Sequence, residues 1–130
     1  SLNTTTLSLG TLSLTSVSSA SLTLSASTTA LTGYTVYVSE DGNLRGSGGT
    51  IDDVSDGAVS AGSEEYGIRT SGGDGVLSSD TAIGGTVAVV STSTVAVGHQ
   101  TGVVFSASIG TGSVGGSYSH SVTFSITANP

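Results

Sequence analysis

The chain lacks cysteine, methionine, tryptophan and lysine, and it contains a single proline. Without cysteine it has neither disulfides nor thiolate metal sites. Only Arg45 and Arg69 are cationic against nine carboxylates, which gives a formal net charge of −7. That balance argues against nucleic acid as a partner, because neutralising phosphates needs lysine and arginine, and it disfavours an anionic membrane surface. No apolar run reaches about 18 residues, so we expect no membrane span in the mature chain.

The residues that the chain does contain are sharply partitioned. All eleven charged side chains lie between positions 40 and 80, and residues 1–39 and 81–130 carry none. In those flanks apolar residues alternate with small and hydroxyl residues, which is the period of a strand with one apolar and one polar face. Such a strand needs another sheet to cover its apolar face. At 130 residues the chain is long enough for one domain with its own core.

The alternation predicts an all-β fold without helices. We expect strands over residues 20–26, 34–38, 63–70, 86–91, 103–109 and 118–128, after two short strands at 7–9 and 12–14 that are separated by a β-bulge at Gly10. About seven to nine such strands indicate an antiparallel β-sandwich or jelly roll. We assign a single sandwich domain to residues 18–130 and an extension to residues 1–17. The Gly- and Asp-rich residues 40–80 are predicted to be loop-rich and solvated, with both arginines in loops.

The extension is unusually apolar for a chain terminus. It carries six large apolar side chains: Leu2, Leu7, Leu9, Leu12, Leu14 and Val17. Burying them is worth on the order of 10 kcal/mol, as much as the net stability of a typical domain, so we expect them to be covered. They form either the first strand of their own domain or a donor strand that completes the sheet of a neighbouring copy.

The length of the extension permits the second arrangement. Residues 1–14 span roughly 45 Å when extended, which exceeds the ~36 Å width of a compact domain of this size. Because a donated strand makes a head-to-tail contact, its repetition gives an open filament rather than a closed ring.

Two stretches resemble secreted filament proteins. The sequence TLSLGTLSL at 6–14 resembles the Gly-Thr-Leu start of mature subunits in the TasA and camelysin group, and GGSYSHSVTFSI at 115–126 is similar to the last strand of spore-coat-U-type and chaperone–usher pilin domains. The resemblance implies a jelly-roll or incomplete immunoglobulin-like sandwich that polymerises through donor strands. It also implies copies of the same chain as the partners.

One acidic stretch deserves consideration as a cation site. The candidate ligands are Asp52, Asp53, Asp56, Glu64 and Glu65. The EF-hand pattern requires an oxygen ligand at the position of Val54 and a glutamate at the position of Ser63, so the stretch does not match an EF-hand calcium loop. We therefore expect a solvated acidic loop without a metal, and a looser cation site is the alternative.

Few residues suggest other chemistry. His120 falls on the apolar face of the last strand, where we expect a buried ring bonded to a carbonyl or hydroxyl group, and His99 is predicted to lie in a turn after Gly98. No nucleophile-elbow motif accompanies the many serines, so we expect neither an enzyme nor a cofactor. Asn3 begins an Asn-Thr-Thr sequon and is a candidate for glycosylation.

These observations favour a structural role outside the cell. The absence of lysine, methionine and cysteine is typical of a mature secreted product that resists proteases and oxidation. We expect a subunit of an extracellular, pilus-like filament or a surface layer, with its own copies as partners. The alternative is an adhesin or carbohydrate-binding module that uses the 40–80 loops to hold its ligand.

Overall fold

The structure is a computed structural model that describes residues 1–46, 49–113 and 118–130. These residues form strands and no helix, so the all-β prediction is confirmed. The eight strands are β1 (Ser18–Thr28), β2 (Tyr34–Glu40), β3 (Leu44–Gly46), β4 (Gly49–Ile51), β5 (Glu65–Ser71), β6 (Val87–Thr92), β7 (Ala96–Ser108) and β8 (Val122–Ala128).

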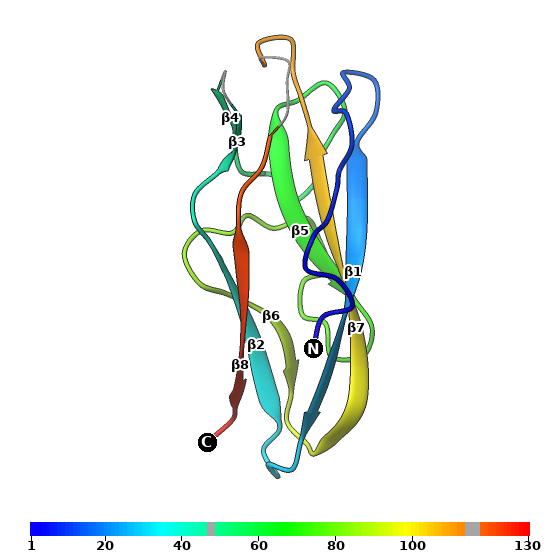
Figure 1. The fold of residues 1–130 in the computed structure, drawn as a ribbon, viewed down its shortest axis with the longest axis vertical. Coiled ribbons are helices and arrows are strands. Elements are labelled where there is room, and N and C mark those ends of the chain that lie inside the picture. The colour runs from blue at the N-terminus through cyan, green and yellow to red at the C-terminus, as the bar shows by residue number, and fades with distance from the viewer. Residues whose placement is uncertain (47–48, 114–117) are drawn as a thin grey trace.

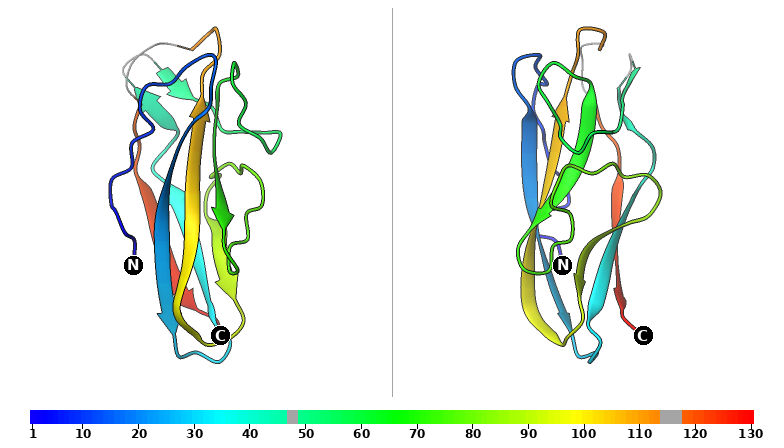
Figure 2. Two further views of the ribbon diagram at one scale, coloured as in Figure 1. Left: turned by 90° about the vertical axis from the view of Figure 1, so that its right-hand side faces the viewer. Right: turned by 180° about the vertical axis from the view of Figure 1, so that it is seen from behind.

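Six of the strands form two three-stranded antiparallel sheets. One sheet has the order β1-β7-β5 and the other has the order β6-β2-β8, while β3 and β4 form a separate two-stranded hairpin. Figures 1 and 2 show the two larger sheets as two layers of an elongated molecule, with the strands running along its long axis. Buried apolar side chains from both sheets belong to one continuous core.

The predicted period-two pattern is observed on the central strands. Tyr34, Val36 and Val38 of β2 are buried, whereas Tyr37 between them faces outward and is exposed. Leu22 and Leu24 are likewise buried on β1. Alternation therefore places one face of each strand in the core, as pleated backbone geometry requires.

One side of the molecule is closed by the segment between β5 and β6. Ile68 of β5 and Thr81 exchange two backbone hydrogen bonds of 2.9 and 2.8 Å. Val76 donates its N–H to the Val89 carbonyl of β6 at 3.0 Å. Residues 72–86 thus satisfy the outer edges of both strands and join the two sheets along this side.

A partly buried polar contact strengthens this closure. Asp74 Oδ2 accepts a hydrogen bond from the Tyr34 hydroxyl at 3.0 Å and lies 2.6 Å from His99 Nδ1. Tyr34 belongs to β2 and His99 to β7, so the contact links the segment to both sheets. The predicted turn at His99 is wrong, because β7 begins at Ala96 and continues through Gly98.

The acidic middle of the chain is less solvated than predicted. It contributes β3, β4 and β5, and five of its apolar side chains are buried: Leu44, Ile51, Val54, Tyr66 and Ile68. Arg45 lies in β3 and Arg69 in β5, so the prediction that both arginines occupy loops is wrong. Each arginine side chain pairs with an aspartate, Arg45 with Asp41 and Arg69 with Asp80.

The predicted N-terminal strands at 7–9 and 12–14 are not formed. In the extension (residues 1–17) only Leu2 pairs with a strand residue, through an isolated bridge to Leu24. Gly10 has a φ of 68°, and it forms no β-bulge because neither flanking segment pairs as a strand. The last strand also starts later than predicted, at Val122, although Ser119 makes an isolated bridge to Arg45. The predicted strand begins at Tyr118, and the residue before it, Ser117, lies outside the described residues.

The turn between β1 and β2 offers a test of the fold. Gly33 has a φ of 83°, and a Cβ there would overlap the carbonyl oxygen of Thr92. We expect Gly33→Ala to lower the free energy of unfolding by about 1–3 kcal/mol in urea titrations. Gly84→Ala is the matched control, since a Cβ there meets nothing within 4 Å, and it should stay within about 0.5 kcal/mol of wild type. Equal stability of the two variants would contradict the described turn.

Candidate functional site

The opposite side of the molecule, between β1 and β8, is not closed by a strand. Asp41 donates its N–H to Ser121 at 3.1 Å, and Asn129 donates to Gly33 at 3.0 Å. The β2–β8 register is continuous, so odd-numbered residues of β8 hydrogen-bond towards β2 and even-numbered residues direct their N–H and C=O groups away from it. No hydrogen bond from another described residue reaches those outward backbone groups of Val122, Phe124 and Ile126.

The inner face of β8 is also incompletely covered. Phe124 lies opposite Val38 and Ile126 lies opposite Val36, so both β8 side chains share the core face of β2. Val36 and Val38 are fully buried, whereas the Ile126 side chain remains 56% exposed. An apolar core face therefore reaches the surface along this edge.

A hollow follows the same edge. It has a volume of about 540 Å³ between the edges of β1 and β8, and it continues into a smaller hollow of about 160 Å³ beside Ile126. We call the two hollows together the groove. One wall is the extension itself, through residues 1, 2 and 4–12. The other walls include Leu22, Leu24, Leu44, Tyr66, Phe105, His120, Val122, Phe124 and Ile126.

The extension lies across the groove of its own chain. Figure 1 shows this segment, in dark blue, running between β8 and β1 before it turns into β1. The predicted interface residues Leu2, Leu7, Leu9 and Leu12 pack partly against the core, whereas Leu14 and Val17 are exposed. The structure thus brings four of the six predicted residues to the groove.

The extension is held to the domain mainly at its start. Asn3 donates its N–H to the Thr23 carbonyl at 3.0 Å, and its Oδ1 accepts from the Thr23 N–H at 2.8 Å. Between Thr4 and Ser16 the hydrogen bonds within the described residues are local, such as the bond from Gly10 N–H to Ser8 Oγ at 3.2 Å, apart from one at 3.4 Å from Ser18 Oγ to Thr11. The segment therefore pairs with the edge of β1 only at residues 1–3 and covers the rest of the groove without sheet hydrogen bonds. Asn3, the candidate glycosylation site, is exposed.

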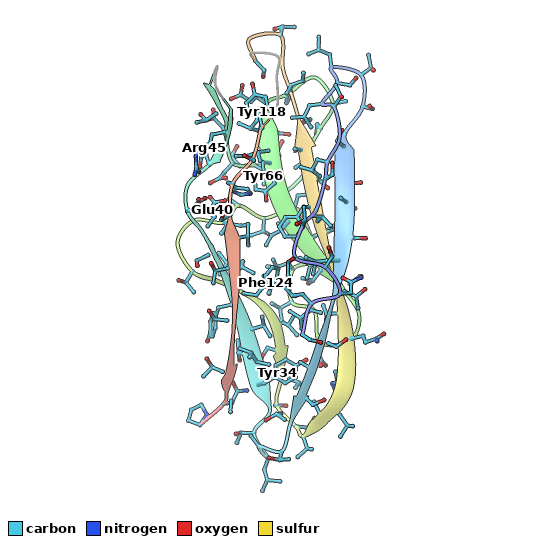
Figure 3. The ribbon with its side chains drawn as sticks, viewed as in Figure 1. Tyr34, Glu40, Arg45, Tyr66, Tyr118 and Phe124 are labelled. Carbon is cyan, nitrogen blue, oxygen red and sulfur yellow. The ribbon has the colours of Figure 1, made fainter. Side chains whose placement is uncertain are left out.

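A buried polar cluster stands at one end of the groove. His120 Nδ1 lies 3.0 Å from the Gly42 carbonyl and 3.2 Å from Glu40 Oε2, and its Nε2 lies 2.8 Å from the Tyr66 hydroxyl. The carbonyl can only accept, so Nδ1 carries a proton. The side chains of His120 and Glu40 are only 6% and 7% exposed. The prediction of a buried His120 bonded to a carbonyl and a hydroxyl is therefore confirmed, and Figure 3 shows Glu40 and Tyr66 near this end of the molecule.

The carboxylates of this cluster are electrostatically strained. Glu40 Oε2 and Asp53 Oδ1 are buried, and neither accepts a well-oriented hydrogen bond from the described residues. Burial, followed by repulsion from Asp53 and Asp41, raises the pKa of Glu40 to about 7. Burial also raises the pKa of Asp53. Asp41 behaves in the opposite way, because hydrogen bonds from Arg45 lower its pKa to about 2.

The carboxylates of the candidate cation loop are not brought together. Glu65 accepts the Ser60 N–H at 2.8 Å, Glu64 accepts the Ser113 hydroxyl at 2.7 Å, and the Asp56 carboxylate accepts the Ala58 N–H at 3.2 Å. Asp52 is exposed, whereas Asp53 joins the buried cluster. In the part of the chain that the structure describes, no group of three or more acidic, histidine or cysteine side chains is arranged to hold a metal ion.

Sequence reasoning overlooked Glu40 although a signal was present. The alternation of Tyr34, Val36 and Val38 continues at Glu40, so the same rule that buries the valines places this carboxylate on the inner face. The groove itself carries no comparable signal, because it depends on which strands lie at the edges of the two sheets.

Comparisons with protein-family models, with curated proteins and with solved structures found no match. No helix of the described residues is long and apolar enough to cross a membrane. The assignment of function therefore rests on the groove, the extension and the polar cluster.

The raised pKa of Glu40 predicts a pH-dependent stability. Between about 4.5, the ordinary pKa, and about 7, the folded state binds more protons than the unfolded state, so the free energy of unfolding falls as pH rises. We expect a loss of about 1–2 kcal/mol between pH 5 and 8, measured by urea unfolding. Glu40→Gln should remove this loss, while the exposed control Asp56→Asn should retain it. A flat wild-type profile would refute the predicted protonation of Glu40.

Proposed function

We propose that the chain is a structural subunit of an extracellular filament or surface layer. It is a β-sandwich that polymerises by head-to-tail β-strand complementation. In this proposal residues 1–17 of one copy enter the groove of the next copy, between β1 and β8. Successive copies then form an open chain, because the donating and accepting surfaces differ.

The two-layer arrangement supports the sandwich. The β1-β7-β5 and β6-β2-β8 sheets share one core, and strands within each sheet are antiparallel. One pair of edges is joined by residues 72–86, and the other pair is separated by the groove. A sandwich with one strand position vacant has this form.

The observation that carries the proposal is the open edge of β8. Its outward backbone groups lack partners among the described residues, and its inward residues Phe124 and Ile126 lie beside the groove. An added strand would supply both missing interactions, since its backbone would extend the sheet and its alternate side chains would fill the hollow. Edge strands of this kind are templates for pairing with another chain.

The chemistry of the extension matches this vacancy. It carries no charge, and leucines occupy alternate positions at Leu7 and Leu9 and again at Leu12 and Leu14. Each leucine that moves from partial to full burial contributes up to about 1.5–3 kcal/mol. Within a single copy the extension covers the groove without regular strand pairing. If the extension of a neighbouring copy replaced it there, it would add a hydrogen-bonded strand to the sheet.

The alternative binding-module function has less support. It would place a ligand on the 40–80 loops, yet much of that region packs into the core through residues such as Ile51, Tyr66 and Ile68.

The extracellular location rests on composition, chiefly the absence of cysteine, methionine and lysine.

Substitutions in the full-length extension test the proposal. We expect Leu7→Ser with Leu9→Ser to abolish filaments seen by electron microscopy, because two apolar anchors worth about 3–6 kcal/mol are lost. Thr6→Ala with Ser8→Ala is the matched control on the alternate positions and should assemble normally. Circular dichroism should show strand content in both variants. Normal assembly of the leucine variant would exclude the extension as the donor.

Introduced cysteines distinguish donation within a copy from donation between copies. The chain has no native cysteine, and Leu9 and Val122 both line the groove. Mixing the single variants Leu9→Cys and Val122→Cys under assembly conditions should give disulfide-linked dimers on non-reducing gels. The double variant, oxidised as a monomer, should form an internal bridge and then fail to polymerise. If the mixture yields no cross-linked dimers although filaments form, this groove is not the acceptor.

A further inference from the structure

The polar cluster at the end of the groove joins elements from both sheets. Tyr66 belongs to β5 of one sheet, Glu40 ends β2 of the other, and His120 immediately precedes β8. The Tyr66–His120 contact, at 2.8 Å between oxygen and Nε2, therefore crosses from one sheet to the other. Tyr66 and His120 also line the groove. We call Glu40, Asp53, Tyr66 and His120 the acid clasp.

The backbone around the acid clasp is tied by few hydrogen bonds. Arg45 and Ser119 exchange two backbone bonds of 2.7 and 3.2 Å, and Asp53 is bridged to Tyr66. The Asp41 carboxylate additionally accepts the Ser121 N–H at 3.0 Å. These contacts position the residues that lead into β8, so weakening the clasp would free the start of the open edge strand.

The charges that face Glu40 do not balance at alkaline pH. Asp41, which directly follows β2, is paired with Arg45 of β3. Asp53 and its neighbour Asp52 add negative charge from the segment after β4, Tyr66 is neutral, and His120 is the one remaining group that can carry positive charge. In acid Glu40 holds a proton and the repulsion is relieved. Once Glu40 ionises, Glu40 and Asp53 repel each other, and the buried oxygens Glu40 Oε2 and Asp53 Oδ1 accept no well-oriented hydrogen bond from the described residues.

We propose that the acid clasp is a proton-controlled fastening that keeps this end of the groove closed in acid and loosens it as pH rises through neutrality. This inference rests on the proposed function in one respect, namely that the groove accepts the extension of a second copy. Its consequence for that function is that strand exchange between copies is faster at alkaline pH than in acid.

The two arginines provide an internal measurement of local opening. Both arginine side chains are 45% exposed and paired with an aspartate, and they are the only sites for trypsin. Arg45 lies beside the clasp, whereas Arg69 lies on β5 and pairs with Asp80 away from it. The ratio of cleavage after Arg45 to cleavage after Arg69 cancels the pH dependence of the protease and reports opening near the clasp.

We expect this ratio to rise on the order of tenfold between pH 6 and 8 in the unassembled full-length protein. A tenfold change in the opening equilibrium corresponds to a difference of about one pKa unit between the closed and open states. Glu40→Gln should give a pH-independent ratio, and Asp53→Asn, a second variant in case the first does not fold, should reduce the rise. Asp56→Asn changes net charge equally and should behave as wild type. A constant wild-type ratio, or an undiminished rise in Glu40→Gln, would overturn the proposal.

Sedimentation of filaments at the same pH values separates the two proposals. A pH-dependent ratio in a protein that never polymerises supports the clasp and counts against the filament. Filaments from a protein with a constant ratio support the polymer and remove the clasp.

Discussion

The structure depends on how the apolar inner faces of two three-stranded sheets are covered at their edges. Along β5 and β6 the cover is made of backbone hydrogen bonds, with residues 72–86 bonded to both edge strands. Along β1 and β8 the cover is the extension, which hydrogen-bonds to β1 only through residues 1–3 and otherwise contributes leucine side chains. On the β5–β6 side both the backbone hydrogen bonds and the burial of apolar side chains are completed. On the β1–β8 side both are only partly completed. This asymmetry makes the second side the candidate for contact with another molecule.

Two polar contacts join the sheets, one partly buried and one largely buried, and they differ in what surrounds them. Tyr34, Asp74 and His99 form a compact set in which one carboxylate serves two donors, and they anchor the segment that closes the satisfied side. In the acid clasp one buried oxygen of each carboxylate, Glu40 Oε2 and Asp53 Oδ1, lacks a hydrogen-bond partner among the described residues, and the clasp borders the groove. Buried polar groups lacking partners reduce stability. Their position beside the open edge is consistent with a role in controlling access to it.

Much of the strand pattern could be predicted from the sequence, and the exceptions have physical reasons. Alternation located β1, β2, β6 and β7 because their partners lie within the domain. The extension alternates in the same way around Leu7 and Leu9, yet a strand needs a hydrogen-bonding partner, and the single chain offers it only its own groove. In residues 40–80 the strand predicted at 63–70 is observed as β5, whereas the frequent glycine and aspartate hid β3 and β4, two three-residue strands that pair with each other. The groove could not be predicted, since the edge position of β8 is a property of sheet order.

The connection between the extension and β1 determines how the proposed filament would respond to tension. The extension runs directly into β1, which is paired with β7 from Ser18 opposite Ala107 to Thr28 opposite Ala96. A pull transmitted through the extension would act nearly parallel to β1, so the β1–β7 hydrogen bonds would be loaded in shear and would have to break together. Peeling them one at a time needs a force perpendicular to the strands. In the proposed filament this geometry would favour mechanical strength along the filament axis over resistance to sideways bending.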